Sequence, residues 1–124
     1  DPPTFKLPKS QDLLKLIPWI EKLDDSLVMN LSKIIEIKIF PANYSFDNEL
    51  NSNNIGILVR GNAKFNDNDQ SNDLEIGFII SKRNKKITSS SKVVSNSPLT
   101  LIWIAESKYN SFVELVKDFD NQIS

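Results

Sequence analysis

The periodicity of the apolar residues changes at Ile35, and this change limits the chain to a small set of folds. Upstream of that position the apolar residues recur at helical spacing. Ile35, Ile37 and Ile39 then alternate with Glu36 and Lys38, which is the pattern of a half-buried strand. The chain therefore passes from a helical segment into a β-rich one.

Short strands are expected to fill most of the chain between residues 40 and 104. We predict strands at 44–46, 55–60, 63–65, 74–80, 92–95 and 99–104. Stretches rich in loop residues separate them, at 48–54, 66–72, 82–86 and 89–91. The last strand is apolar on both faces, so we expect it to lie centrally, with Trp103 in the core. Regularly spaced short strands are typical of a sandwich or a barrel.

Helices are expected on both sides of these strands. Ser10 is placed to cap a short helix that ends near Pro18, and Asp24 or Asp25 to cap a second one. Ser107 is placed to cap a final helix. The buried stripe of that helix consists of Phe112, Val113, Leu115, Val116 and Phe119. The expected fold class is mainly β, with two short N-terminal helices and one C-terminal helix.

Several residue types are missing or scarce, and this excludes whole chemistries. The 124 residues include no His and no Cys, so a structural zinc site, a thiol nucleophile and a serine–histidine triad are excluded. Three glycines are too few for a P-loop or a dinucleotide fingerprint. The net charge of −1 argues against direct binding of nucleic acid. We therefore expect a non-catalytic domain with no metal and no cofactor.

The ends of the chain and its longest apolar run bear on organisation and location. Residues 1–9 hold three prolines and are interpreted as a linker into one domain, residues 10–124. Because the chain opens with Asp1, we expect it to be excised from a larger protein. The run 99–105 is far shorter than the ~20 residues that span a bilayer. With no signal-peptide pattern and no Cys, we expect a cytoplasmic location without membrane insertion.

Four segments carry a characteristic set of corner residues in a fixed order. Residues 14–23 read L…P-W-x-x-x-L, residues 40–46 open with F-P, residues 55–65 contain Gly61, and residues 93–104 contain Ser97-Pro98. In this order they resemble the cyclic-nucleotide-binding domain, the β-roll module of Crp-type regulators, kinase regulatory subunits and gated channels. The resemblance implies a double-stranded β-helix, or jelly roll. Ala42 stands in place of the family's usual glycine, so its turn is expected to differ in type.

The resemblance also implies where a ligand would lie. In the family a cyclic nucleotide occupies a cassette reading roughly G-D-x-F-G-E-L-A…R-S/T-A, whose amides and arginine hold the phosphate and whose glutamate accepts the ribose hydroxyl. On this chain Gly77 matches the first glycine, Ser81 and Lys82 stand at the Gly-Glu positions, and serine replaces the arginine within residues 88–91. The ligand-binding candidates in this degenerate cassette are Gly77, Ser81, Lys82, Ser89 and Ser90.

These departures predict that cAMP and cGMP do not bind usefully. Loss of the arginine removes a charge-assisted pair, an effect of about 2–5 kcal/mol. Lys82 has donors only and cannot accept the ribose hydroxyl. Residues 82–86 are instead interpreted as a solvated hairpin tip. Residues 66–73 resemble a calcium loop but lack its diagnostic Gly and Glu, at Asn72 and Phe78, so they are interpreted as an acidic hairpin tip.

The resemblance implies a regulatory or docking module that contacts the other domains of its parent polypeptide. A transporter or ABC exporter is the preferred parent. Two alternatives remain: a sensor of another small anionic ligand in the same pocket, and a cupin-like enzyme with a carboxylate metal site. Trp19 is expected either to pack against the roll or to lie exposed on a docking surface.

Overall fold

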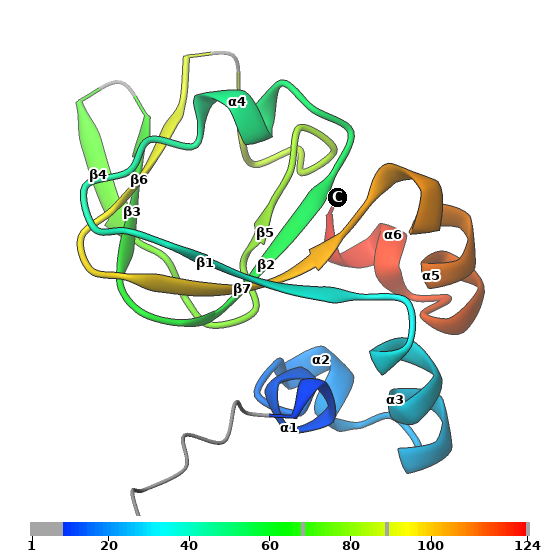
Figure 1. Cartoon of the computed structure of the whole chain (residues 1–124). Coiled ribbons are helices and arrows are strands. Elements are labelled where there is room, and N and C mark those ends of the chain that lie inside the picture. The colour runs from blue at the N-terminus through cyan, green and yellow to red at the C-terminus, as the bar shows by residue number, and fades with distance from the viewer. Residues whose placement is uncertain (1–8, 68, 89, 124) are drawn as a thin grey trace, which may run out of the picture.

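The computed structural model of the protein describes residues 9–67, 69–88 and 90–123 (Figure 1). The helices are α1 (Ser10–Leu14), α2 (Pro18–Glu21), α3 (Asp25–Ser32), α4 (Asp47–Leu50), α5 (Tyr109–Leu115) and α6 (Phe119–Gln122), with a 3₁₀ turn η1 (Glu106–Lys108). The strands are β1 (Glu36–Phe40), β2 (Ile55–Arg60), β3 (Ala63–Asp67), β4 (Gln70–Asp73), β5 (Ile79–Ile80), β6 (Lys92–Ser95) and β7 (Leu99–Ile104). The predicted order of helices, strands and helix is confirmed.

Two antiparallel sheets form the body of the molecule. One has the strand order β1-β7-β2-β5, and the other has the order β4-β3-β6. Ser45 makes an isolated bridge to Val94 of β6, next to the second sheet. The sheets curve toward each other into a roll, and the N-terminal and C-terminal helices gather at one side of it (Figure 1). The predicted roll with flanking helices is confirmed.

Two hydrophobic clusters divide the first sheet between its faces. The helix-side cluster contains Ile55, Ile57, Val59, Ile102 and Ile104, packed with buried residues of α1, α3, α5 and α6. The roll cluster contains Phe46, Leu58, Ala63, Ile80, Val93, Leu99, Leu101 and Trp103. Side chains of adjacent residues in a strand point to opposite faces, which explains why β2 and β7 carry apolar residues on both faces. Trp103 is buried in the core, as predicted.

Three expectations about strands and loops differ from the structure. Residues 44–46 do not form a full strand, although they pair with β6 through the Ser45 bridge and the backbone hydrogen bonds Phe46 N–H to the Val93 carbonyl and Ser95 N–H to the Tyr44 carbonyl, and α4 occupies the expected loop that follows. Only Ile79–Ile80 of the expected strand 74–80 is extended, since Gly77 turns the chain at a φ of 97°. β4 forms in the expected loop 66–72, where it pairs with β3 although it contains no apolar residue.

One predicted helix boundary is confirmed, and four others differ from expectation. Asp24 caps α3 by accepting a hydrogen bond from the backbone N–H of Ser26 at 3.1 Å. Ser10 and Ser107 cap nothing, because they lie inside α1 and η1. Pro18 opens α2 instead of ending a helix, since proline fits the first helical position. The final helix breaks at Val116 into α5 and α6.

The turn after β1 agrees with the expectation that Ala42 lacks the conformational freedom of glycine. Positive φ falls on Asn43, at 61°, and not on Ala42, and Asn tolerates this conformation better than most residues. Ala42 therefore does not have to adopt the positive φ that glycine would allow. Gly61 has the positive φ that was predicted, 101°, and a Cβ there would lie 2.3 Å from the carbonyl oxygen of Pro98.

Candidate functional site

The candidate residues between β5 and β6 are divided between different places. Lys82 lines a pocket of about 380 Å³, whereas Gly77 lines a separate and larger one. Ser81 is fully buried, and its Oγ accepts a hydrogen bond from the backbone N–H of Arg83 at 3.1 Å. Ser90 is exposed, and Ser89 lies outside the described residues. The chain therefore does not bring Gly77 and Lys82 together around one ligand.

The smaller pocket lies between α4 and the segment that leads into β6. Its lining residues are Asp47, Leu50, Asn51, Lys82, Ile87, Thr88, Ser91 and Lys92. Two lysines against one aspartate give this lining a positive balance. The hydroxyl groups of Thr88 and Ser91 are 2.9 Å apart, and Ser91 Oγ accepts the Thr88 backbone N–H at 3.0 Å. The pocket can therefore offer ammonium and hydroxyl donors to an anion.

Most of these lining residues were missed as site residues. Thr88 and Ser91 stand beside the candidates Ser89 and Ser90 in the sequence, and the resemblance directed attention to the cassette positions alone. Asp47 and Asn51 belong to α4 and the residue after it, and that helix was predicted to be a loop. The polar run 88–92 was the one available signal for this pocket, since it combines hydroxyl and ammonium donors.

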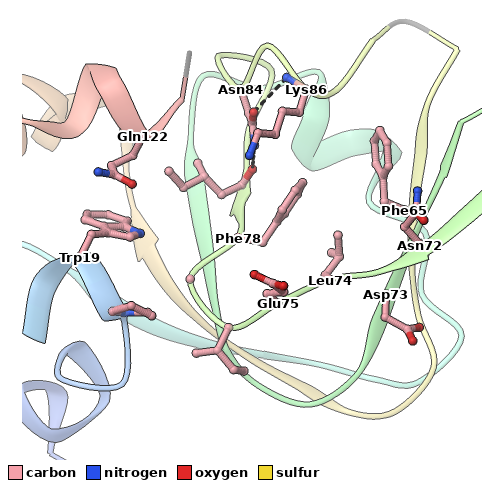
Figure 2. Close-up of a pocket in the computed structure, with 14 residues that line it drawn as sticks. Trp19, Phe65, Asn72, Asp73, Leu74, Glu75, Phe78, Asn84, Lys86 and Gln122 are labelled. Atoms are coloured by element: carbon pink, nitrogen blue, oxygen red, sulfur yellow. Dashed lines mark hydrogen bonds between the residues drawn. The ribbon is translucent and has the colours of Figure 1, made fainter.

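The expected solvated hairpin tip at 82–86 is found only in part: its three lysines are exposed, but β5 and β6 belong to different sheets, and the segment between them is held to its surroundings. Asn84 is only 3% exposed, and its Nδ2 donates to the Ile79 carbonyl at 2.7 Å while its Oδ1 accepts the Lys86 N–H at 3.0 Å (Figure 2). The Lys85 N–H donates to the carbonyl of Ile123 at 3.0 Å. The Arg83 guanidinium lies over the Tyr109 ring of α5.

A cation–π contact ties the same segment to α5. The Arg83 guanidinium carbon lies 4.0 Å from the centroid of the Tyr109 ring. Tyr109 in turn makes an edge contact with Phe119, with ring centroids 6.3 Å apart, and Phe119 packs on Phe112 at 5.0 Å. Residues 82–86, called the cassette segment below, are therefore held by the C-terminal helices.

Aromatic rings occupy the interior of the roll. The ring centroid of Phe40 lies 4.9 Å from that of Phe46, 5.2 Å from that of Tyr44 and 6.2 Å from that of Trp103. The Tyr44 hydroxyl donates to the Glu49 carboxylate at 2.6 Å. This hydrogen bond, together with burial and the nearby negative charges, raises the pKa of Tyr44 to about 12. The rings thus fill space inside the roll beside α4.

The larger pocket, of about 570 Å³, opens between α2 and the turn at Gly77. Figure 2 shows Trp19 and Gln122 on one side of it, Glu75 and Phe78 in the middle and Phe65 on the other. Trp19 is half-buried, and its ring centroid lies 5.9 Å from that of Phe119. Trp19 therefore matches neither expectation fully, because it packs against Phe119 of α6 rather than against the roll and is half-buried rather than exposed.

Residues 9–67, 69–88 and 90–123 contain no group of three or more His, Cys, Asp or Glu side chains that could hold a metal ion. None of the helices in this described part is long and apolar enough to cross a membrane. Asp67 and Asp73 end the paired strands β3 and β4.

The strand order, the helices that flank the roll and the segment between β5 and β6 define the fold as a cyclic-nucleotide-binding β-roll. The solved structures to which it is similar agree. A cAMP-bound PfPKA-R aligns with a TM-score of 0.68 at 10% identity, over 88% of this chain and 40% of that one. PKAR CBD2 bound to Sp-2Cl-cAMPS aligns with a TM-score of 0.69 at 11% identity, over 88% of this chain and 77% of that one.

The alignment with one bacterial structure covers almost the whole of both chains. It is a candidate cyclic nucleotide-binding protein from Geobacter metallireducens GS-15, with a TM-score of 0.66, 18% identity and 92% of each chain covered. Neither a protein-family model nor a curated protein matches the sequence. At these identities the similarity establishes the fold, and the chain spans 40% of the PfPKA-R structure.

Proposed function

We propose that this domain is a non-catalytic regulatory or docking module with a degenerate cyclic-nucleotide site. It does not bind cAMP or cGMP usefully, and it acts in the cytoplasm through contacts with the other domains of its parent polypeptide. A transporter or ABC exporter is the preferred parent. The proposal extends the fold, which is shared with nucleotide-bound structures, to a member that has lost the ligand.

The observation that carries this proposal is the fastening of the cassette segment to the rest of the protein. The Asn84 side chain and the Lys85 backbone N–H donate to the carbonyls of Ile79 and Ile123. The Arg83 guanidinium packs on the Tyr109 ring, with its Nε buried and without a hydrogen-bond partner among the described residues. Serine, within residues 88–91, replaces the arginine that binds the phosphate in the family. A buried phosphate needs such a charge-assisted partner. Contacts within the chain therefore take the place of contacts to a ligand.

The aromatic interior supports the same proposal. Phe40, Tyr44 and Phe46 pack on one another beside α4, and Tyr44 donates to Glu49. A nucleotide placed among these rings would have to displace packed side chains, which costs free energy. Without the phosphate-binding arginine, no charge-assisted contact offsets that cost. The fold is thus stabilised without a ligand.

Isothermal titration calorimetry of the folded chain with cAMP and with cGMP tests the proposal. Loss of the arginine alone corresponds to a roughly 30-fold to several-thousand-fold weaker affinity, so no binding is expected at micromolar concentrations. Circular dichroism of the same sample establishes that the protein is folded. Micromolar affinity for either nucleotide would overturn the proposal.

A second candidate function is a sensor of another small anion, favoured by the two lysines and two hydroxyl groups of the smaller pocket. Inorganic phosphate should then raise the melting temperature, because a ligand that binds only the folded state stabilises it. The rise should be absent in Lys82→Gln and Lys92→Gln. It should persist in Lys64→Gln, an exposed lysine on β3. An equal response in all four proteins would rule out this pocket.

A further inference from the structure

β1 is the terminal strand of the four-stranded sheet, and its outer edge has no strand partner among the described residues. It pairs with β7 on one side only. Ile37 is 36% exposed and Ile39 is 70% exposed, although their alternation predicts a half-buried strand. That prediction is wrong because the helices that cover β2 and β7 do not reach over β1. An edge strand with exposed apolar residues is a template for pairing with another strand.

The two faces of β1 carry different chemistry. Glu36 and Lys38 pair with Trp103 and Leu101, so they share the face of the roll interior. Lys38 is fixed there, with its Nζ 4.4 Å from the centroid of the Trp103 ring. Ile37 and Ile39 pair with Ile102 and Thr100 and lie on the opposite face. One face of the edge is therefore charged and the other is apolar.

We propose that β1 pairs antiparallel with β1 of a second copy of this chain, about a two-fold axis that passes beside Ile37. Ile37 then lies opposite the partner's Ile37, and Glu36 lies opposite the partner's Lys38. Two-fold symmetry makes the Lys38 contact with the partner's Glu36 identical. The pairing joins two four-stranded sheets into one continuous sheet, with two ion pairs on one face and isoleucines on the other.

Charge complementarity selects both the occupant and the register. The sequence Glu36-Ile37-Lys38 is complementary to its own antiparallel copy, and opposite charges directly across two strands stabilise the pair. The neighbouring two-fold register, centred on Lys38, would place two lysines opposite each other, which is destabilising. Glu36 has no ion-pair partner elsewhere in the described chain. A second copy thus satisfies the charge and covers Ile37.

A five-residue strand gives a small interface, so the dimer should be weak. Interfaces below about 1,200 Å² belong to the transient class. Self-association is therefore measured by sedimentation equilibrium of the whole chain, at concentrations up to on the order of 1 mM. The wild type is expected to show a concentration-dependent dimer.

Charge reversal tests the register directly. Glu36→Lys and Lys38→Glu should each weaken the dimer by about tenfold or more, because each replaces two attractive pairs with two repulsive ones. Mixing the two variants should give a heterodimer at least as strong as the wild type, and the double variant should regain self-association. Glu114→Lys, an exposed residue of α5, is the control with the same charge change as Glu36→Lys and should not alter the dimer.

Each result supports or overturns the proposal. A wild type that stays monomeric throughout this range overturns it. So does a dimer that both reversals leave unchanged, since association would then use another surface. Failure of the mixed variants to associate better than either alone overturns the register. Equal melting temperatures of Glu36→Lys and the wild type establish that the effect does not come from unfolding.

Discussion

The two faces of the first sheet differ in how completely they are closed. On the helix side, Ile55, Ile57, Ile102 and Ile104 are fully buried beneath helices. On the roll side the same strands meet aromatic residues, of which Phe40, Tyr44, Phe65 and Phe78 are only partly buried. The closed face consists mainly of aliphatic side chains and the open face includes many rings. The helix-side face is therefore the more completely closed of the two, and we expect its residues to contribute more to stability.

The largest expected effect tests that division with two phenylalanines. Phe112 is fully buried in the helix-side cluster, and Phe112→Ala should lower the free energy of unfolding by about 3–5 kcal/mol. Phe40 is partly buried at the mouth of the roll, and Phe40→Ala should cost about 1–2 kcal/mol, because less apolar area returns to water. Urea unfolding of both variants measures the difference. Equal losses would mean that the two faces contribute alike.

The next effect sharpens the comparison, because two glycines with positive φ differ in the space around them: Gly61 lies against Pro98 and Leu99 of the roll, and Gly77 lies against α2. A Cβ at Gly61 would meet the Pro98 carbonyl oxygen at 2.3 Å and Leu99 Cδ2 at 2.7 Å. At Gly77 the nearest atom would be Pro18 Cδ, at 3.2 Å. Gly61→Ala should therefore cost at least about 3 kcal/mol, and Gly77→Ala about 1–2 kcal/mol, mainly from positive φ with a smaller contribution from the tight contact at Pro18.

Thermal unfolding of the two alanine variants provides the measurement. Both glycines have a φ near 100°, so backbone strain is common to them and the difference reports the clash. A loss for Gly77→Ala as large as that for Gly61→Ala would show that the contacts of a Gly61 Cβ with Pro98 and Leu99 add nothing to the cost of positive φ.

Much of the fold was predictable from local pattern, and the exceptions share a cause. β2, β6 and β7 begin and end where alternation and apolar runs predict. β4 was missed because its residues Gln70–Asp73 are all polar, and only pairing with β3 makes it a strand. The break at Val116 was missed because Phe119 continues the helical stripe in sequence, while tertiary packing turns it back onto Phe112. Local propensity cannot report such long-range contacts.

The site was less predictable than the fold. Lys82 was identified from its place in the cassette, but Gly77 lies in a different pocket. Arg83 was treated as part of a solvated tip, whereas it packs on Tyr109, which lies 26 positions further along the sequence. Spacing along the chain carries no information about a partner contributed by a distant helix.

The third prediction concerns the link between the two regions, which is the contact of Arg83 with Tyr109. Arg83→Ala should lower stability by about 0.5–1 kcal/mol, the range for a cation–π contact at an exposed site. Backbone amides of residues 82–87 should exchange faster with solvent, because the segment loses an anchor on α5. Hydrogen exchange followed by NMR measures this.

A double-mutant cycle with Tyr109→Leu separates the contact from other effects of each substitution. The coupling energy should equal the loss for Arg83→Ala, about 0.5–1 kcal/mol. Additive losses would mean that the guanidinium and the ring do not stabilise each other, and that other contacts hold the cassette segment to the helices.

The smallest effect is a pH dependence inside the roll. Glu49 raises the pKa of Tyr44 from 10.0 to about 12, so the folded state holds this proton more tightly than the unfolded state does. The resulting stabilisation is fully present below pH 10 and is lost as the pH rises through about 12. The stability advantage of the wild type over Tyr44→Phe should therefore shrink across that window. Glu49→Gln removes both the charge and the carboxylate acceptor, so the tyrosinate absorbance of Tyr44 should appear at lower pH than in the wild type. A tyrosine that already titrates near pH 10 in the wild type would mean that the mouth of the roll is more open to water than the hydrogen bond to Glu49 implies.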